Sequence, residues 1–396
     1  MSEVVNIPQL RFPEFNGGWK ESRIGKIYKD LRTGSTPSRA VKSYFKGDNP
    51  WITSGELKYN RISTTFEQIS DEAIKDTNLV LYQPGTLFIA ITGLEAPGTR
   101  GKCAINAVPS TTNQSCLAFR KVDSVDTIYM FYWYLKYGKP LYFKYAQGTK
   151  QQSFNNKIVE KFQIFLPNKP EQQKIAAFLS AVDNKIEQLS KKQELLGEYK
   201  KGLMQQIFSQ AIRFKADDGS DFPDWEEKRL GGCILENQKS QIQVNFVSDN
   251  TERDDVNIYP FFTSGNKALF TDSPIVEGDN IFLSTGGIAT INFYSGKGSY
   301  STDVFCISSV SENTRFIYYY LLSILIKIDR KLFYGSGLKH LDKKAFRKII
   351  TTLPALPEQT KIANFLSSVD SKIEQVGKQL DESKQFKKAL LQRMFV

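Results

Sequence analysis

Short turns that combine glycine with hydroxyl, amide and basic side chains recur along this chain. Glycine lets a backbone approach a ligand closely, lysine and arginine meet phosphate or guanine, and glutamine and asparagine pair with adenine. The turns are residues 34–38, 53–56, 92–93, 99–102 and 148–153 in the first half of the chain, and residues 263–266, 284–287, 295–298 and 335–340 in the second. Each turn alone resembles an ordinary solvated turn, but as a set they predict contacts with DNA. The predicted contact residues are Ser35, Thr36, Ser38, Arg39, Thr53, Ser54, Glu56, Thr92, Arg100, Lys102, Thr149, Lys150, Gln151, Gln152, Thr263, Ser264, Asn266, Lys267, Ser284, Thr285, Lys297, Ser336, Lys339 and His340.

The sequence lacks the residue patterns of known catalytic sites. Its single histidine, His340, has no nucleophile elbow around it, so a DNA contact or a plain surface position explains it better than a Ser-His-Asp hydrolase. Residues 93–98 lack the ending of a Walker A motif, and residues 48–51 lack the second proline of the amino-methyltransferase motif. Residues 223–228 hold acidic and lysine residues like those of many nucleases, but at too short a spacing to come from separate strands. We therefore expect no catalytic residue in this chain and no cofactor bound by it.

Composition indicates a folded protein whose partner is a polyanion. The 396 residues hold 53 Lys+Arg against 42 Asp+Glu, a formal net charge of +11, and such a field favours nucleic acid. The longest apolar stretch, residues 316–326, is about half of a membrane span and predicts a buried helix. Without a secretory leader pattern, we expect a cytoplasmic protein. The four cysteines are scattered with no histidine nearby, so we expect free, buried thiols rather than a metal site or disulfides.

The clearest feature of the chain is an internal repeat. Residues 171–208 and 358–395 align without a gap at a shift of 187, and 20 of the 38 positions are identical. Residues 19–25 match residues 225–231 at a shift of 206, and residues 51–55 match residues 261–265 at 210. The order is kept while the shift drifts, so each half consists of a leading segment, a variable body and a constant helix.

The repeated segment predicts a coiled-coil arm. Apolar residues recur at alternating steps of four and three over about five heptads in both copies. At 38 residues each helix would be about 57 Å long, far longer than the usual helix of a globular domain. This length favours two helices that bury their apolar stripes against each other along a shared seam, over the alternative of two separate core helices. The expected seam residues are Ile175, Leu179, Val182, Ile186 and Leu189 in the first copy, and Ile362, Leu366, Val369, Ile373 and Val376 in the second.

Chain order predicts how the two helices run. About sixteen residues separate the end of the first helix from the second body, and that body ends where the second helix starts. The helices should therefore be antiparallel, with the two bodies at opposite ends and related by a half turn. Short apolar runs at residues 79–82, 86–92, 280–284 and 303–307 predict strands, and residues 128–137 and 316–328 predict helices.

These elements together predict an α+β fold, in which two α/β bodies in pseudo-twofold arrangement are joined by an antiparallel coiled coil. The expected domains are a first body at residues 1–165, which the resemblance described below implies is a target recognition domain, a first helical spacer at 166–208, and a linker at 209–225. A second recognition domain at 226–352 and a second spacer at 353–396 follow.

The chain resembles the specificity subunits of type I restriction–modification systems. The resemblance rests on the duplicated Leu-Pro-x-x-Pro-Glu-Gln-x-Lys-Ile-Ala segments from Leu166 and Leu353, and on residues 34–55. It implies two domains that each read half of a bipartite, asymmetric DNA site. It also implies that the helices bind two modification (methyltransferase) subunits, with restriction subunits added, and that S-adenosylmethionine, ATP and Mg belong to those partners. The alternatives are a self-contained DNA methyltransferase or nuclease, and a coiled-coil adaptor whose bodies bind protein.

Overall fold

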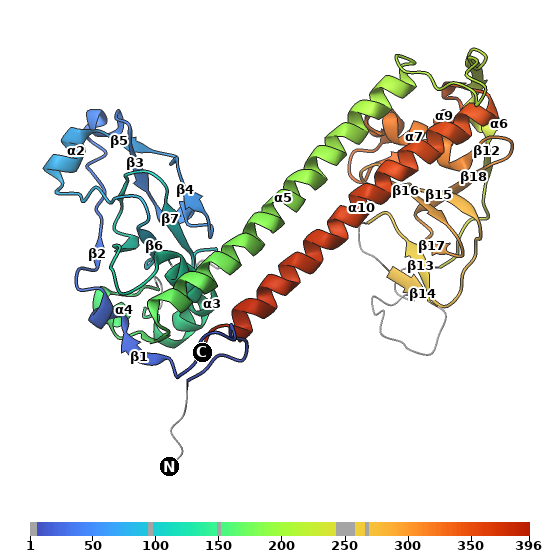
Figure 1. The fold of residues 1–396 in the computed structure, drawn as a ribbon. Coiled ribbons are helices and arrows are strands. Elements are labelled where there is room, and N and C mark those ends of the chain that lie inside the picture. Colours follow the sequence, from blue (N-terminus) through green and yellow to red (C-terminus); the bar gives the residue numbers. More distant parts are fainter. Residues whose placement is uncertain (1–5, 94–97, 149–151, 243–257, 266–268) are drawn as a thin grey trace. The chain divides into compact units, whose positions relative to one another are not determined.

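The chain folds into two compact units, each of which combines one body with half of each long helix. The computed structural model describes residues 6–93, 98–148, 152–242, 258–265 and 269–396. Unit 1 comprises residues 1–189 and 379–396, and unit 2 comprises residues 190–378. Both units contain helices and small mixed sheets (Figure 1), so the expected α+β fold is confirmed.

Unit 1 is built on a five-stranded sheet in the order β2-β9-β6-β7-β4 and a three-stranded sheet in the order β5-β3-β8. A two-stranded antiparallel ribbon, β1-β10, joins the beginning of the body to its end, with Lys20 opposite Leu166. The strands are β1 (Lys20–Arg23), β2 (Arg32–Thr33), β3 (Asn49–Ile52), β4 (Arg61–Ile62), β5 (Gln68–Ile69), β6 (Leu87–Ala90), β7 (Cys103–Asn106), β8 (Thr111–Thr112), β9 (Cys116–Phe119) and β10 (Gln163–Leu166). The helices are α1 (Ile24–Ile27), η1 (Lys42–Phe45), η2 (Ser54–Glu56), α2 (Asp71–Asp76), α3 (Thr127–Tyr145) and α4 (Asn156–Glu160).

Within its described residues, unit 2 repeats this plan with four strands rather than five in its larger sheet. Its sheets run in the orders β12-β18-β15-β16 and β14-β13-β17, and the ribbon β11-β21 closes the body as β1-β10 does in unit 1. The strands are β11 (Glu226–Arg229), β12 (Ile234–Glu236), β13 (Tyr259–Phe262), β14 (Leu269–Thr271), β15 (Asp279–Ser284), β16 (Ile291–Ser295), β17 (Ser299–Tyr300), β18 (Val304–Ser309), β19 (Phe333–Tyr334), β20 (His340–Leu341) and β21 (Ile350–Leu353). The helices are α6 (Leu230–Cys233), α7 (Thr314–Ser323), α8 (Leu325–Leu332) and α9 (Lys343–Arg347).

The two repeated segments are the long helices α5 (Lys169–Phe208) and α10 (Leu356–Arg393). In unit 1 the beginning of α5 shares a core with the end of α10, through Ile175 and Leu179 on one side and Leu390 on the other. In unit 2 the end of α5 shares a core with the beginning of α10, through Ile207 and Leu366. The two helices are therefore antiparallel within each unit, as the chain order predicts.

Most of the expected seam is buried. Ile175, Leu179, Leu189, Ile362, Leu366, Val369 and Val376 are at most 4% exposed. Val182, Ile186 and Ile373 are only half-buried. Because burial is deepest near the two bodies, the bodies supply part of the apolar surface that covers the seam.

Three expected elements differ from the structure. Residues 79–82 form no strand and pair only through an isolated bridge between Tyr82 and Ser110. The expected helix at residues 128–137 extends over all of α3. The expected single helix at residues 316–328 breaks at Ile324, and Ile326 is 69% exposed. A helix directs its side chains to all sides, so one core cannot cover every residue of a long apolar run. After the break, Ile326 is exposed to solvent while Ile328 is buried.

A buried glutamate at the start of each long helix holds the segment that leads into the body. In unit 1 the Arg11 guanidinium donates two hydrogen bonds of 2.7 Å to Glu171, and Trp19 Nε1 donates a third at 3.2 Å. The equivalent bonds in unit 2 join Arg213 to Glu358 at 2.9 and 3.0 Å. Both glutamate side chains are fully buried, so their charge is stabilised by the paired arginine rather than by water.

A second polar contact in unit 1 ties the body to both long helices. The Tyr132 hydroxyl, on α3, donates to Asp183 Oδ2, on α5, at 2.8 Å. Lys387 Nζ, on α10, lies 2.6 Å from the other oxygen of Asp183 and 5.7 Å from the Tyr132 ring centroid. Burial and the nearby carboxylate raise the pKa of Tyr132, so its hydroxyl stays a donor at neutral pH.

Unit 2 contains the same contact at positions shifted by 187. The Tyr319 hydroxyl donates to Asp370 Oδ2 at 2.6 Å, and Lys200 Nζ lies 2.6 Å from Asp370 Oδ1. Burial raises the pKa of Tyr319 as well. We call each tyrosine–aspartate–lysine set a clamp. The clamps are kept although the bodies around them differ, which indicates that both bodies are fixed to the helices in the same way.

Replacing Asp183 with alanine is expected to lower the free energy of unfolding by about 2 kcal/mol, because the Tyr132 hydroxyl and the Lys387 ammonium both lose their partner. Urea denaturation checks this value. The exposed pair of Lys191 and Glu194 supplies the matched control, since Glu194→Ala removes a contact that water already screens and should leave the urea midpoint close to that of the wild type. An equal loss in the two variants would contradict a structural role of the clamp.

Candidate nucleic-acid interface

One group of predicted contact residues gathers around β3 in unit 1. Gly34 packs so closely on β8 that a Cβ there would lie 1.5 Å from the Thr112 carbonyl oxygen, so only glycine fits. The turn that follows is fixed by Trp51 Nε1, which donates to the Ser35 carbonyl at 3.2 Å. Thr36 remains exposed and donates to Gln114 at 2.7 Å, so this turn presents its hydroxyl edge to solvent.

Arg39 is the exposed cation of this group. Its guanidinium forms two hydrogen bonds with Glu67, of which the bond from Nη2 is 2.7 Å long, and it lies 4.2 Å from the Phe45 ring centroid. The Arg39 side chain is still 58% exposed. A held but exposed guanidinium is able to meet a phosphate or a guanine edge at little further entropic cost. Ser38 beside it is also exposed.

Glu56 does not belong to the contact surface, although the sequence predicts it there. The residue is 7% exposed, and its carboxylate accepts hydrogen bonds from the backbone nitrogens of Thr53 at 2.6 Å and Phe66 at 2.7 Å. A buried carboxylate with these donors acts as a structural cap of η2. Thr53 and Ser54 are half-buried on the same turn.

The turn that carries Arg100 and Lys102 is positioned by a close contact between two glycines. Gly101 has a positive φ of 68°, and a Cβ on it would lie 2.6 Å from the backbone of α3 beside Gly138. Lys102 Nζ lies 4.2 Å from the Tyr59 ring centroid, and the Arg100 guanidinium lies 4.7 Å from that of Tyr142. Two predicted cations on this turn are thus held against two different aromatic rings.

The remaining predicted residues of unit 1 lie near the end of α3, after β6 or outside the described part. Gln152 accepts a hydrogen bond from the Tyr142 hydroxyl, which places it near Arg100. Thr92 is half-buried after β6. Thr149, Lys150 and Gln151 lie outside the described residues.

Unit 2 gathers its predicted residues around one backbone carbonyl. Ser264 Oγ and Thr285 Oγ1 both donate to the Asp303 carbonyl oxygen, at 2.7 and 2.8 Å. The turn after Thr285 pairs with the turn of Lys339 and His340, since the Gly287 nitrogen donates to the Lys339 carbonyl at 2.9 Å. Lys339 and His340 are exposed, so three turns distant in sequence bring hydroxyl groups, a lysine and an imidazole together.

Other predictions for unit 2 meet a different environment. Ser284 is 1% exposed and its hydroxyl donates to the Ile288 carbonyl at 2.9 Å, so it is a turn-forming residue and not a contact. Thr263 is half-buried, and Lys297 and Ser336 are exposed on separate turns. Asn266 and Lys267 lie outside the described residues.

The structure also exposes apolar residues that sequence reasoning missed. Phe66 is 82% exposed beside Lys58, and Ile288 is 75% exposed between Thr285 and β16. Arg61 is exposed on the short strand β4 in the same part of unit 1. Nothing in the local sequence distinguishes Phe66 from a core residue, because whether a side chain is covered depends on distant segments.

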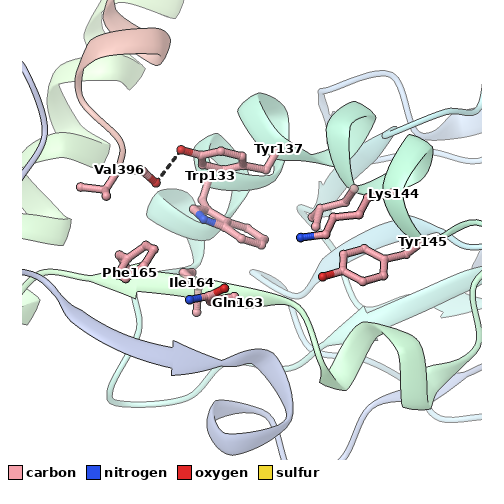
Figure 2. A pocket seen from close by; sticks show the side chains of 9 residues that line it. Trp133, Tyr137, Lys144, Tyr145, Gln163, Ile164, Phe165 and Val396 are labelled. Atoms are coloured by element: carbon pink, nitrogen blue, oxygen red, sulfur yellow. Dashed lines mark hydrogen bonds between the residues drawn. The ribbon is translucent and has the colours of Figure 1, made fainter. Parts of the chain in front are cut away.

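A small pocket of about 160 Å³ in unit 1 lies between α3, β10 and Val396 (Figure 2). Trp133, Tyr137 and Lys144 line it, and the Tyr137 hydroxyl donates to the Val396 carbonyl oxygen at 2.5 Å. None of the predicted contact residues lines this pocket. It therefore belongs to the packing of α3 on the end of the chain rather than to the contact surface.

The described residues show no arrangement suited to metal chemistry. Within them no group of three or more His, Cys, Asp or Glu residues could hold a metal ion. All four cysteines are free and buried, and burial raises the pKa of Cys116 to about 12, so this thiol is unreactive at neutral pH. Of the helices in the described ranges, none is long and apolar enough to cross a membrane.

The arrangement of two similar bodies on repeated helices matches a known family. Residues 16–196 and 223–382 match the family model of the type I restriction modification DNA specificity domain, one copy in each half. The chain belongs to this family. The resemblance drawn from the duplicated helices is therefore confirmed, and the two matched copies correspond to the two halves of the repeat.

Relatives of known role are specificity subunits of type I enzymes. The MjaVIII specificity subunit of Methanocaldococcus jannaschii is 25% identical over 418 residues, which cover 96% of this chain and 92% of that protein. The MjaIX specificity subunit of the same organism is 31% identical over 239 residues, and the match spans 54% of each protein. The chain thus matches one relative over nearly its full length and the other over about half.

Solved structures agree on the fold of the specificity domain family. The S subunit of the type I restriction–modification system of M. genitalium has a TM-score of 0.67 at 17% identity, over 98% of this chain and 99% of that one. A chain from a structural study of complex assembly in the type I R-M system has a TM-score of 0.53 at 15% identity, again over 98% and 99%. At these identities the likeness concerns the fold alone.

Proposed function

We propose that this chain is the DNA-reading subunit of a type I restriction–modification system. Each unit reads one half of a bipartite, asymmetric site, and the chain directs methyltransferase and restriction subunits to that site. The observation that carries the proposal is the contrast between the two units. Their clamps and glutamate–arginine pairs are equivalent, whereas their contact turns hold different residues.

Electrostatic attraction supplies the affinity and base contacts supply the choice of sequence. A net charge of +11 favours binding to the phosphate backbone, with a steep dependence on salt. Each good bidentate contact with a base edge is worth about 1–3 kcal/mol of discrimination. In unit 1 the residues for this role are Thr36, Arg39, Arg100 and Lys102, and in unit 2 they are Ser264, Thr285, Lys339 and His340.

The repeated helices support a partner that binds twice. Because α5 and α10 share 20 of 38 residues at a shift of 187, each unit offers a similar surface to one copy of the same modification subunit. Restriction subunits then join that assembly.

S-adenosylmethionine, ATP and Mg are used by those partners, and an adenine to be methylated is flipped out of the duplex into the partner's active site. Residues 1–165 and 226–352 are the two recognition domains, the helices are spacers, and the site of action is the cytoplasm.

Exchanging residues 226–352 for the equivalent body of another family member is expected to change one half-site and leave the other unchanged. The physical reason is that the contact turns of unit 2 form hydrogen bonds within their own unit. Sequencing of methylated genomic sites in a host that carries the partner subunits measures the result. The reciprocal exchange of residues 20–165 is the control and should change only the other half-site.

The alternative functions give different results with the purified chain. A self-contained methyltransferase or nuclease would modify or cut DNA when the purified chain is incubated alone with the cofactor. A protein-binding adaptor would show no shift of random duplex DNA in a gel, with or without its partners. Loss of both half-sites after a single body exchange would contradict independent reading by the two units.

A further inference from the structure

Phe66 is an aromatic side chain that the fold presents to solvent on a firmly held turn. At 82% exposure it has the most exposed large apolar side chain in the described residues. It follows β4 and precedes β5 in unit 1, and β5 pairs with β3. A lone exposed apolar residue is common on protein surfaces, so exposure alone carries no conclusion.

The backbone on both sides of Phe66 is fixed by buried polar contacts. Its own nitrogen donates to the buried carboxylate of Glu56 at 2.7 Å. On one side Thr65 Oγ1 accepts from the Trp51 nitrogen at 3.2 Å and donates to the Glu67 carbonyl at 2.6 Å. On the other side the Glu67 carboxylate pairs with Arg39. A turn held at three successive residues cannot fold its aromatic ring back into the core.

The surroundings of the ring are those of a nucleic-acid contact. Lys58 Nζ lies 5.7 Å from the centroid of the Phe66 ring, and Arg61 is exposed on the preceding strand. Through Glu56 and Glu67, the Phe66 turn is bonded directly to the turns of Thr53 and Arg39, which are predicted DNA contacts. The ring and these cations are therefore carried by one rigid group of turns.

We propose that Phe66 is a wedge that enters double-stranded DNA and stacks against an opened base step beside the half-site read by unit 1. Apolar side chains on rigid elements unstack a base step in this way, and the flanking cations hold the adjacent phosphates. This inference rests on the proposed function. The ring would sense how easily a base step deforms, which depends on the sequence of that step. It would therefore contribute specificity at a position where no side chain forms hydrogen bonds with the base edges.

The test uses the full chain in complex with its modification subunits and a duplex that contains the methylated site. The duplex carries 2-aminopurine, whose fluorescence rises on unstacking, at successive positions across the half-site and the base steps that flank it, except at the adenine that the partner flips out and its two neighbours. Wild type should raise the signal several-fold at one step, and Phe66→Ala should abolish the rise. Phe66→Trp should keep it. Loss of stacking should weaken binding by about fivefold to 150-fold.

Two control variants separate a wedge from other roles. Leu81→Ala removes an exposed apolar side chain of the same unit that lies outside the long helices and the predicted contact turns, and should change neither fluorescence nor affinity. Lys58→Gln should reduce the salt dependence of binding while leaving the fluorescence rise, and Phe66→Ala should leave the salt dependence unchanged. Since each replaced side chain is exposed, the urea concentration at the midpoint of unfolding should be the same for all variants as for the wild type.

Several outcomes would overturn the inference. A fluorescence rise that persists in Phe66→Ala means that the ring does not open the step. Weaker binding of the modification subunit in the absence of DNA identifies Phe66 as a protein contact. A wild-type complex that binds its site tightly without a rise at any position refutes the wedge while the proposed function stands. A wild-type complex that binds no DNA refutes the proposed function itself.

Discussion

Replacing Glu171 with alanine is expected to lower the free energy of unfolding by about 3–5 kcal/mol. Glu171 is fully buried, and its two oxygens accept from the Arg11 guanidinium and from Trp19 Nε1. Without the carboxylate, the mostly buried cation of Arg11 has neither its partner nor full access to water. The same substitution at Glu358 should cost less, because the Arg213 side chain is 27% exposed against 13% for Arg11.

Tryptophan fluorescence during urea denaturation measures this loss. Trp19, Trp51 and Trp133 lie in unit 1 and Trp225 lies in unit 2, so the signal reports mainly on unit 1. Glu14→Ala is the matched control, since Glu14 forms an ion pair with Lys174 in which both side chains are more than 40% exposed. The control should leave the urea midpoint close to that of the wild type, because water screens an exposed ion pair. If Glu171→Ala were equally mild, the buried pair would not be what fixes the leading segment.

Inserting one heptad into both long helices is expected to lengthen the stretch of DNA between the two half-sites, which neither unit reads, by up to about three base pairs. Seven helical residues add about 10.5 Å, and a base pair adds about 3.4 Å. The insertions belong after Leu189 in α5 and after Lys378 in α10, where the two compact units meet along the chain. Leucine at the seam positions of the insert keeps the apolar pattern continuous. Sequencing of the methylated sites should show unchanged half-sites at a longer spacing.

A heptad inserted into only one helix is the control for this experiment. It leaves the helices unequal, so the residues that pair α5 with α10 in the two units can no longer all meet. Methylation should then be lost in a variant that is less stable. An unchanged gap in a folded variant with both insertions would contradict the proposal that the helices set the spacing.

Much of the scaffold was predictable because it is local and periodic. A seam with steps of four and three specifies a helix and its apolar face from neighbouring residues alone, and the repeat shift of 187 pairs the two copies. Antiparallel packing followed from the short linker. The boundaries were harder, as the break at Ile324 illustrates, because an apolar run does not reveal which side chains the core has room to cover.

The candidate contact surface was predictable only in part. The turns around β3 and around Asp303 do come together in their own units, and the polar composition of the turns indicated where to look. Glu56 and Ser284 nevertheless turn inward, because backbone donors at the same turns satisfy them. Residue type therefore indicates what a side chain is able to bind, but not whether it is free to bind a ligand.

The sequence by itself determined the duplication, the two antiparallel helices, the absence of known catalytic motifs and the family resemblance. All of these depend on residue identity and spacing along the chain. Only the tertiary structure decided that Glu171 and Glu358 are buried against distant arginines, that each body is clamped to both helices, and that Phe66 faces solvent. Burial and hydrogen-bond partners are set by segments far apart in sequence, and no local pattern encodes them.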